Sequence, residues 1–173
     1  MRKTLFLDRD GVINVDVHYL HRIEDMKFIQ GAIKALKVAV EAGYQLIVIT
    51  NQSGVARGYY TEDDVQTLHR YMGEQLATAG APITAFYYCP HHEKGVVPAY
   101  TKSCECRKPR PGLVLQAVRE HQVDVAHSFM IGDKPSDVAT AEAAGMDGYL
   151  FEGIDLADFL LPILAKRGYD ESV

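Results

Sequence analysis

Acidic residues follow two apolar segments of the chain, where they could perform chemistry. Asp8 and Asp10 come after "TLFL", and Asp133 comes after "FMIG". A carboxylate can attack phosphorus, and a second carboxyl group nearby can protonate the leaving oxygen and later take a proton from water. A lone Asp-x-Asp pair is as easily an acidic strand end, but a third acid adds a ligand of the kind that magnesium prefers. Together the three aspartates favour metal-assisted phosphoryl chemistry.

Other polar residues stand at equivalent places. The segment after "QLIVI" supplies hydroxyl and amide groups that can cradle phosphate oxygens, although the same residues also make ordinary turns: Thr50, Asn51, Gln52 and Ser53. Lys134 follows Asp133 and could steady the charge of a transferring phosphoryl group. Asp137 lies in the first turn of an expected helix, so we interpret it as a cap or dipole partner in preference to a metal ligand.

The three cysteines of the chain lie in one stretch, "CPHHEKGVVPAYTKSCECRKP". An odd number cannot pair fully, and the spacing of Cys104 and Cys106 is poor for a disulfide between them. With Cys89 and one of two histidines, His91 or His92, they form a Cys3His set, which is typical of structural zinc. Four protein ligands would leave no open position for a catalytic water. The alternative is a group of unligated thiols.

Alternating apolar and helix-period segments indicate how these residues are positioned. Strand-like runs cover residues 4–8, 44–51, 83–89 and 127–133, with a weaker one at 148–153. Helix patterns cover residues 33–40, 61–79, 111–121 and 135–145, and a final helix from residue 155 contains Pro162. We expect Ile33, Leu36 and Val40 to form an apolar stripe, and Thr61 with Asp64 to form a capping box.

This alternation predicts one α/β domain over residues 1–173, a doubly wound, Rossmann-like parallel sheet with right-handed crossovers. Ligands of such sheets bind beyond the carboxyl ends of the strands, where the polar residues above would meet. The formal charge of −5 provides no overall basic field for nucleic acid or anionic lipid. We find no stretch long enough for a signal peptide or a membrane span, and we expect a soluble, cytoplasmic monomer.

Five motifs together resemble the haloacid dehalogenase (HAD) superfamily of phosphatases: "LDRDGVIN", "TNQSGVARG", "YYCPHH", "CECRKPRPG" and "MIGDKPSD". They are most similar to the D-glycero-D-manno-heptose-1,7-bisphosphate 7-phosphatase family, whose relatives include histidinol-phosphate phosphatases. The resemblance covers residues 4–151. It implies that Asp8 forms a phosphoaspartyl intermediate and that Asp10 is the acid/base. It also implies magnesium held by Asp8, the backbone of Asp10, and Asp133.

The same resemblance implies roles for further residues. Thr50 and Lys108 would steady the phosphoryl group, Arg107 would recognise substrate, and the zinc ligands would be Cys89, His91, Cys104 and Cys106. The implied substrate-binding set is Asp16, Val17, His18, Tyr19, Thr50, Asn51, Gln52, Ser53, Arg107, Lys108 and Lys134. The gaps at residues 11–30 and 90–110 are each too short to bury a core, so we expect no separate cap domain and a zinc-binding loop over residues 89–106.

The expected activity is magnesium-dependent removal of the C7 phosphate of a small sugar bisphosphate, in the synthesis of a nucleotide-activated heptose for lipopolysaccharide or another glycan. Histidinol phosphate is an alternative substrate for the same chemistry. A different class is a zinc-stabilised binding module that uses Lys102, Arg107, Lys108 and Arg110 as a basic contact. The acidic balance and the three aspartates disfavour that module. A receiver-type signalling domain fits less well, because Cys89 stands where its acceptor aspartate should be.

Overall fold

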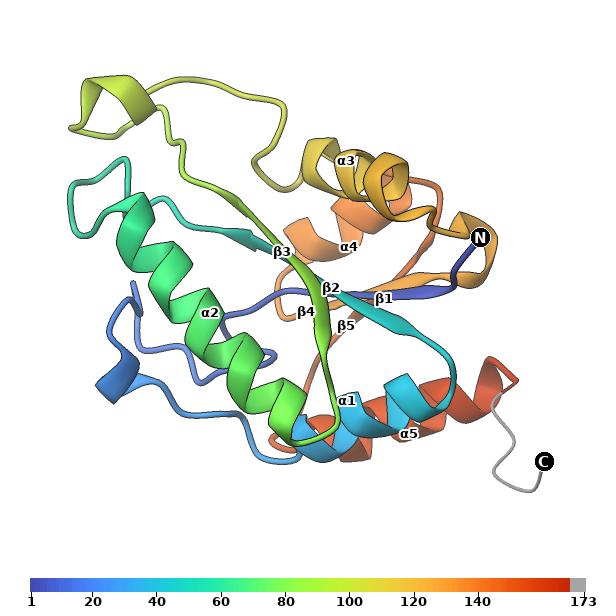
Figure 1. The fold of residues 1–173 in the computed structure, drawn as a ribbon. Helices are drawn as coiled ribbons and strands as arrows, with labels where there is room; N and C mark the ends of the chain where they lie inside the picture. Colours follow the sequence, from blue (N-terminus) through green and yellow to red (C-terminus); the bar gives the residue numbers. More distant parts are fainter. Residues whose placement is uncertain (169–173) are drawn as a thin grey trace.

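A five-stranded parallel sheet forms the centre of the computed structural model, which describes residues 1–168 of the predicted domain (Figure 1). The strands are β1 (Thr4–Leu7), β2 (Gln45–Asn51), β3 (Ile83–Cys89), β4 (Phe129–Gly132) and β5 (Asp147–Leu150). Their order is β3-β2-β1-β4-β5, and every neighbouring pair is parallel. The predicted doubly wound sheet is confirmed. Because the order reverses between β1 and β4, the carboxyl ends of these two strands flank a crevice.

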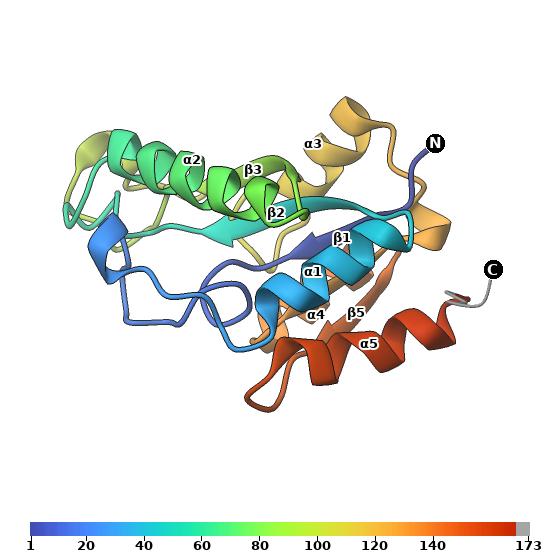
Figure 2. The same ribbon diagram turned by 60° about the horizontal axis from the view of Figure 1, so that its bottom comes forward.

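Helices cover both faces of the sheet, as Figures 1 and 2 show. One face packs against α1 (Ala32–Glu41), α2 (Glu62–Thr78) and α5 (Leu156–Lys166), and the other against α3 (Gly112–His121) and α4 (Pro135–Ala143). In β1, Leu5 and Leu7 enter the first of these cores and Phe6 enters the second. Since both faces are covered, β1, β2 and β4 are apolar along nearly their whole length.

Local signals explain most helix boundaries. The capping box of α2 is present: the Asp64 N–H donates to Thr61 Oγ1 at 3.2 Å, and the Thr61 N–H donates to Asp64 Oδ2 at 2.9 Å. Helix α5 continues through Pro162, because its leucines are buried in the core and offset the lost hydrogen bond. The stripe expected for α1 is wrong in part, since Ile33 is 39% exposed. Small residues face the core there instead: Ala32, Ala35 and Ala39, beside Leu36.

The long segments after β1 and β3 form loops, and neither builds a cap domain within residues 1–168. Each contains only one short 3-10 turn, η1 (Ile23–Asp25) and η2 (Pro98–Tyr100) respectively. The loop after β3 rests on the loop after β2, because the N–H groups of Val96 and Val97 donate to the carbonyl of Ala56 at 2.8 and 2.9 Å. In Figure 1 the loops after β1, β2 and β3 gather on the left side of the molecule. Among the described residues no helix is both long and apolar enough to cross a membrane.

Candidate active site and metal-binding loop

Asp8 lies directly after β1 and is buried, with 6% of the residue exposed. Lys108 Nζ forms an ion pair with Asp8 Oδ1 at 2.9 Å, and the Arg9 N–H donates to the same oxygen at 2.9 Å. Burial raises the pKa of Asp8 to about 8, against the opposing effect of Lys108, while the neighbouring Asp137 and Asp10 raise it further. The carboxylate is thus held in a dry site where positive charge is needed to keep it ionised.

Lys108 stands between two carboxylates. Besides Asp8, its Nζ contacts Asp137 Oδ1 at 2.6 Å and donates to the carbonyl of Ile49 at 2.9 Å. Burial lowers the pKa of Lys108, but Asp8 and Asp137 outweigh burial and raise it overall. Asp137 also caps α4, as predicted, since its Oδ2 accepts from the Lys134 N–H at 3.1 Å. Its ion pair with Lys108 was not predicted, because the pattern showed only a residue in the first helical turn.

Three carboxylates gather where a hard cation would bind. Oxygen atoms of Asp8, Asp133 and Asp137 all lie within 4.8 Å of one another. Asp133 Oδ1 is buried and has no hydrogen-bond partner among the described residues, so it is free to accept a metal ion. Gly11 lies close by with φ of +85°, and a Cβ on it would stand 2.1 Å from Asp133 Oδ2. Burial raises the pKa of Asp133. This donor set fits magnesium.

Asp10 is held at both carboxylate oxygens. Its Oδ1 accepts from Arg9 Nη2 at 2.9 Å and from Asn14 Nδ2 at 3.0 Å, and its Oδ2 accepts from Gln52 Nε2 at 3.0 Å. Burial acts to raise the pKa of Asp10, but the charge of Arg9 and the hydrogen bonds from Asn14, Arg9 and Gln52 lower it overall. The Asp10 side chain is still 22% exposed. It can therefore exchange a proton with a molecule in the adjacent cavity.

A cavity of about 520 Å³ opens above these acids. It contains most of the predicted substrate-binding residues and four that were not predicted, Arg57, Tyr60, Pro109 and Ser136. The predicted residues that line it are Asp10, Asp16, His18, Tyr19, Asn51, Gln52, Ser53, Arg107, Lys108 and Lys134. Two others do not line it: Val17 is 48% exposed, and Thr50 is buried. Arg57 lies within the quoted motif "TNQSGVARG" but was assigned no role, because it belongs to no periodic pattern and stands four residues after Ser53.

The loop over residues 16–19, called the substrate loop after the role that the resemblance implies, has a defined backbone shape. Asp16 Oδ1 accepts from the His18 N–H at 2.9 Å, and His18 and Tyr19 both adopt left-handed conformations, with φ of 58° and 60°. Tyr19 also packs edge to face against Tyr59, with ring centroids 4.8 Å apart. These contacts turn Asp16, His18 and Tyr19 toward the cavity from a segment that carries no regular secondary structure.

The amides after β2 position other site residues. Asn51 Oδ1 accepts from the Lys108 N–H at 3.0 Å, and Asn51 Nδ2 donates to the Lys108 carbonyl at 3.3 Å. Gln52 Nε2 donates to Thr50 Oγ1 at 2.9 Å as well as to Asp10. Tyr60 in turn donates to Gln52 Oε1 at 2.6 Å. The side chains of Asn51 and Gln52 therefore hold the lysine and the second aspartate in place.

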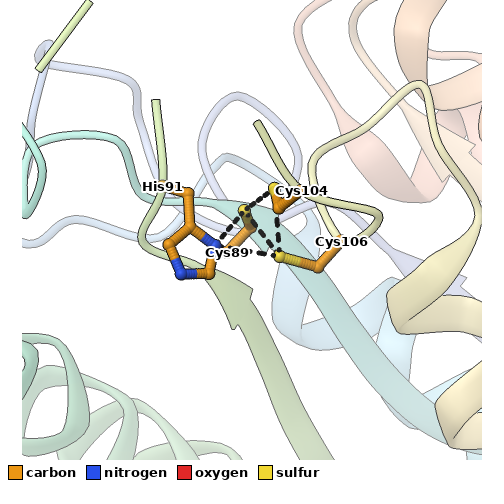
Figure 3. Close-up of side chains that lie close together, drawn as sticks. All are labelled: Cys89, His91, Cys104 and Cys106. Atoms are coloured by element: carbon orange, nitrogen blue, oxygen red, sulfur yellow. Dashed lines mark hydrogen bonds between the residues drawn. The ribbon is translucent and has the colours of Figure 1, made fainter. Parts of the chain in front are cut away.

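The loop over residues 89–106, which we call the cysteine loop, brings its three cysteines and His91 together at the end of β3 (Figure 3). Cys89, His91, Cys104 and Cys106 offer ligand atoms within 4.8 Å of one another, and all three thiols are free. His91 Nδ1 lies 3.3 Å from Cys106 Sγ, whereas His92 Nδ1 accepts from the Lys94 N–H at 2.9 Å. Hydrogen bonds, the largest from Cys89, lower the pKa of Cys106 to about 5 against the effect of burial. Geometry thus selects His91, and the donor set fits zinc.

Two cationic residues of the site directly follow the cysteine loop in the chain. Arg107 and Lys108 follow Cys106 directly in the chain, and both line the cavity. Arg110 donates to the carbonyl of Cys104, which ties the two ends of this turn together. Since Cys89 ends a strand of the sheet, the cluster connects the rigid sheet to the segment that carries Arg107 and Lys108.

A buried aspartate after β1, a lysine paired with it and acids after β4 in a doubly wound sheet define a phosphatase of the HAD hydrolase class. A family model described as HAD-hydrolase-like matches residues 105–153. The D-glycero-beta-D-manno-heptose-1,7-bisphosphate 7-phosphatase of Rhodopseudomonas palustris is 47% identical over 95% of this chain and 92% of its own length. The chain therefore belongs to the heptose-1,7-bisphosphate 7-phosphatase family of HAD hydrolases.

Further similar proteins are heptose bisphosphate phosphatases or HAD-like phosphatases by name. The D-glycero-alpha-D-manno-heptose-1,7-bisphosphate 7-phosphatase of Photorhabdus laumondii is 45% identical over 83% of this chain and 79% of its own. The crystal structure of D,D-heptose 1,7-bisphosphate phosphatase from B. bronchiseptica, complexed with magnesium and phosphate, matches with a TM-score of 0.77 and 30% identity, covering 98% of this chain and 89% of that one. A HAD-like phosphatase from Mesorhizobium loti matches with a TM-score of 0.85, 30% identity and the same coverage.

Proposed function

We propose that the protein removes the C7 phosphate of D-glycero-D-manno-heptose 1,7-bisphosphate, with Asp8 as the nucleophile. The observation that carries this proposal is the buried ion pair between Asp8 and Lys108, because the proposed nucleophile then lies beside a cation that lines the cavity and can stabilise phosphate. The names of the relatives support the substrate. The product would be a heptose 1-phosphate, a precursor for a nucleotide-activated sugar.

The reaction has two steps. An oxygen of Asp8 attacks phosphorus and the bond from phosphorus to the C7 oxygen breaks, while Asp10 gives a proton to the departing oxygen. Water then attacks the phosphorus of phospho-Asp8 and Asp10 takes its proton, which releases inorganic phosphate and restores both acids. The lowered pKa of Asp10 suits the second step. For the first step, the negative charge of a bound phosphate would raise that pKa.

The metal assignments rest on the donor sets. Magnesium would be held by Asp8, Asp133 and the backbone of Asp10, with Asp137 committed to Lys108. When bound, it would keep Asp8 ionised and offset the charge of the phosphoryl group. Zinc would be held by Cys89, His91, Cys104 and Cys106 in a closed structural site.

The polar cavity wall supports a small, charged substrate. Arg57 Nε and Arg107 Nη1 are buried atoms without a hydrogen-bond partner in the described chain, and both residues line the cavity. Such donors suit the oxygens of a sugar bisphosphate. The quoted relatives do not favour histidinol phosphate as the substrate. A basic nucleic-acid contact is also not favoured, because Lys108 is 5% exposed and paired with Asp8.

We propose a cytoplasmic monomer that needs no macromolecular partner.

The direct test is Asp8→Asn, which keeps the shape of the side chain and removes the nucleophile. Phosphate release from the heptose bisphosphate should fall by at least about 1,000-fold, because hydrolysis of phosphate monoesters is among the slowest uncatalysed reactions. Phosphate would be measured colorimetrically, and ³¹P NMR would identify which phosphate is lost. Asp63→Asn, at an exposed position of α2, is the matched control and should keep normal turnover. Near-normal turnover by Asp8→Asn would exclude the mechanism.

A further inference from the structure

Arg9 is a fully buried cation between the two aspartates of the site, with 0% of its side chain exposed. Its Nε and Nη2 donate to Asp10 Oδ1 at 3.3 and 2.9 Å. Nη2 also donates to the carbonyl of Leu20 at 3.1 Å, directly after the substrate loop. Removing a guanidinium from water is expensive, so each of these contacts must be well placed to hold the charge.

Arg9 has a fourth contact that comes from α2. Its Nη1 lies 3.0 Å from His69 Nε2, and His69 is itself 5% exposed. A guanidinium can only donate, so His69 Nε2 must accept and the ring must be neutral, with its proton on Nδ1. Burial and the charge of Arg9 lower the pKa of His69 to about 3, which agrees with a neutral ring. The ring stacks on Phe86 of β3, with centroids 4.6 Å apart and planes inclined by 18°.

As a result, the two carboxylate oxygens of Asp10 accept different numbers of hydrogen bonds. Oδ1 accepts from Arg9 and Asn14, whereas Oδ2 accepts only from Gln52 among residues 1–168. Oδ2 therefore has capacity left for a proton that passes to or from a molecule in the cavity. The orientation of the carboxylate depends on the orientation of Arg9, and His69 fixes the far side of that guanidinium.

We propose that His69 is a positioning residue, which acts through Arg9 to hold Asp10 in the orientation needed for proton transfer to the leaving oxygen. The inference rests on the proposed role of Asp10 as the acid. His69 does not line the cavity, and the polar contact of its ring is with Arg9 and not with a proposed metal ligand. Misplacement of a catalytic group by about 1 Å can cost about 100-fold in rate, so loss of the contact should lower activity without changing the residues of the cavity.

The test uses three substitutions at His69. Gln can place a carbonyl oxygen near the position of Nε2 and accept from Arg9. Asn has the same amide but is one methylene shorter and does not reach, and Phe keeps the ring stacked on Phe86 without an acceptor. The rate constant kcat/KM would be measured for phenyl phosphate and p-nitrophenyl phosphate. It reports the steps up to phosphorylation of Asp8, in which Asp10 acts as the acid.

Leaving-group dependence separates positioning from a general structural role. Nitrophenolate leaves readily without a proton, whereas phenolate depends more on the acid. In His69→Asn and His69→Phe, kcat/KM for phenyl phosphate should fall about 10-fold to 100-fold, and should fall at least about 5-fold less for p-nitrophenyl phosphate. His69→Gln should restore most of the loss. Thermal unfolding would verify that each variant is folded.

Two results would overturn the proposal. Equal losses for the two substrates, or no recovery in His69→Gln, would show that His69 does not act through the acid. Variants that fail to fold while His69→Gln folds would assign the residue to folding alone. Because both probes are aryl phosphates, the test is independent of the sugar. If the wild-type protein cleaved them but not the heptose bisphosphate, the proposed substrate would be wrong and the role of His69 would still be tested.

Discussion

Two buried cations, Lys108 and Arg9, pair with different aspartates of the site. Lys108 forms ion pairs with both Asp8 and Asp137, and Arg9 forms one with Asp10. Burial alone raises the pKa of a carboxyl group. At Asp10, Arg9 and the other hydrogen-bond donors outweigh burial and the pKa is lowered, whereas at Asp8 Lys108 only opposes burial and the pKa stays raised, at about 8. Bound magnesium would therefore be needed to keep Asp8 ionised at neutral pH. The pKa values of Asp8 and Asp10 are shifted in opposite directions by their surroundings. Bound magnesium would lower the first and bound phosphate would raise the second, as the proposed roles of nucleophile and acid require.

The buried neutral histidine predicts a pH dependence of stability. The pKa of His69 is lowered from 6.5 to about 3 in the folded chain, so between these values the unfolded chain binds a proton that the folded chain does not. The free energy of unfolding should therefore decrease as pH falls from about 6.5 toward 3. The contribution of His69 approaches about 1.4 kcal/mol per pH unit.

His69→Gln isolates this term, because glutamine does not titrate. Urea unfolding of the wild type and the variant would be compared at several pH values between 7 and about 4. The wild type should lose stability faster than the variant as pH falls, since carboxylate titrations contribute to both chains. A difference in stability that is constant with pH would contradict a neutral buried ring.

At the scale of the elements, the loop over residues 89–106 is held to its neighbours largely by hydrogen bonds. The Tyr100 hydroxyl donates to Glu62 at the start of α2 at 2.7 Å, and the backbone N–H groups of Val96 and Val97 donate to the carbonyl of Ala56. A segment with so little core needs another crosslink, which the Cys3His cluster can provide through a metal. The loop then presents Arg107 and Lys108 in a fixed direction.

Cys104→Ser should remove zinc and disturb this loop. We expect loss of bound zinc, faster proteolysis within the loop, and a fall in kcat/KM of about 10-fold or more, because Arg107 and Lys108 are no longer held. A colorimetric zinc assay, limited proteolysis and kinetics would measure these effects. Glu105→Gln, the exposed neighbour, is the control and should keep zinc. Full activity with an ordered, zinc-free loop would mean that the cluster does not position the cations.

At the scale of the whole molecule, the site is assembled from four loops on one edge of a sheet. The Asp8 N–H donates to the carbonyl of Ile131 at 3.0 Å, so the acids after β1 and β4 are held in register by the sheet itself. No cap domain covers the site within residues 1–168. Specificity must come from loop side chains such as Arg107 and Tyr19, which fits relatives of similar identity whose names differ only in the sugar anomer.

Magnesium should stabilise the entire fold, because its ligands come together only in the folded chain. At a concentration about 100 times its Kd, the ion would add about 2.7 kcal/mol to the free energy of unfolding, seen as a rise in Tm. Asp133→Asn should abolish most of this rise, whereas Asp63→Asn should keep it. Calorimetry with and without magnesium would measure the effect. An equal rise in Asp133→Asn would place the ion elsewhere.

The sequence by itself determined the strands, most helices and the chemical type of each site residue. Apolar runs and capping signals are local, and Asp8, Asp10 and Asp133 directly follow strands, so short-range physics was sufficient. The Cys3His composition was equally visible, although spacing left His91 and His92 undecided until the geometry separated them.

Only the tertiary structure decided which partners these residues have. The contact between Lys108 and Asp137, and the one between Arg9 and His69, join residues 29 and 60 positions apart, respectively, that no periodic pattern relates. Helix periodicity is compatible with a buried His69, which stands four residues after Val65 and three before Met72, but it gives no sign that the partner of His69 is Arg9. These pairings arise because the sheet brings the ends of β1, β2 and β4 and the inner face of α2 together. Burial then requires that each charge find a partner.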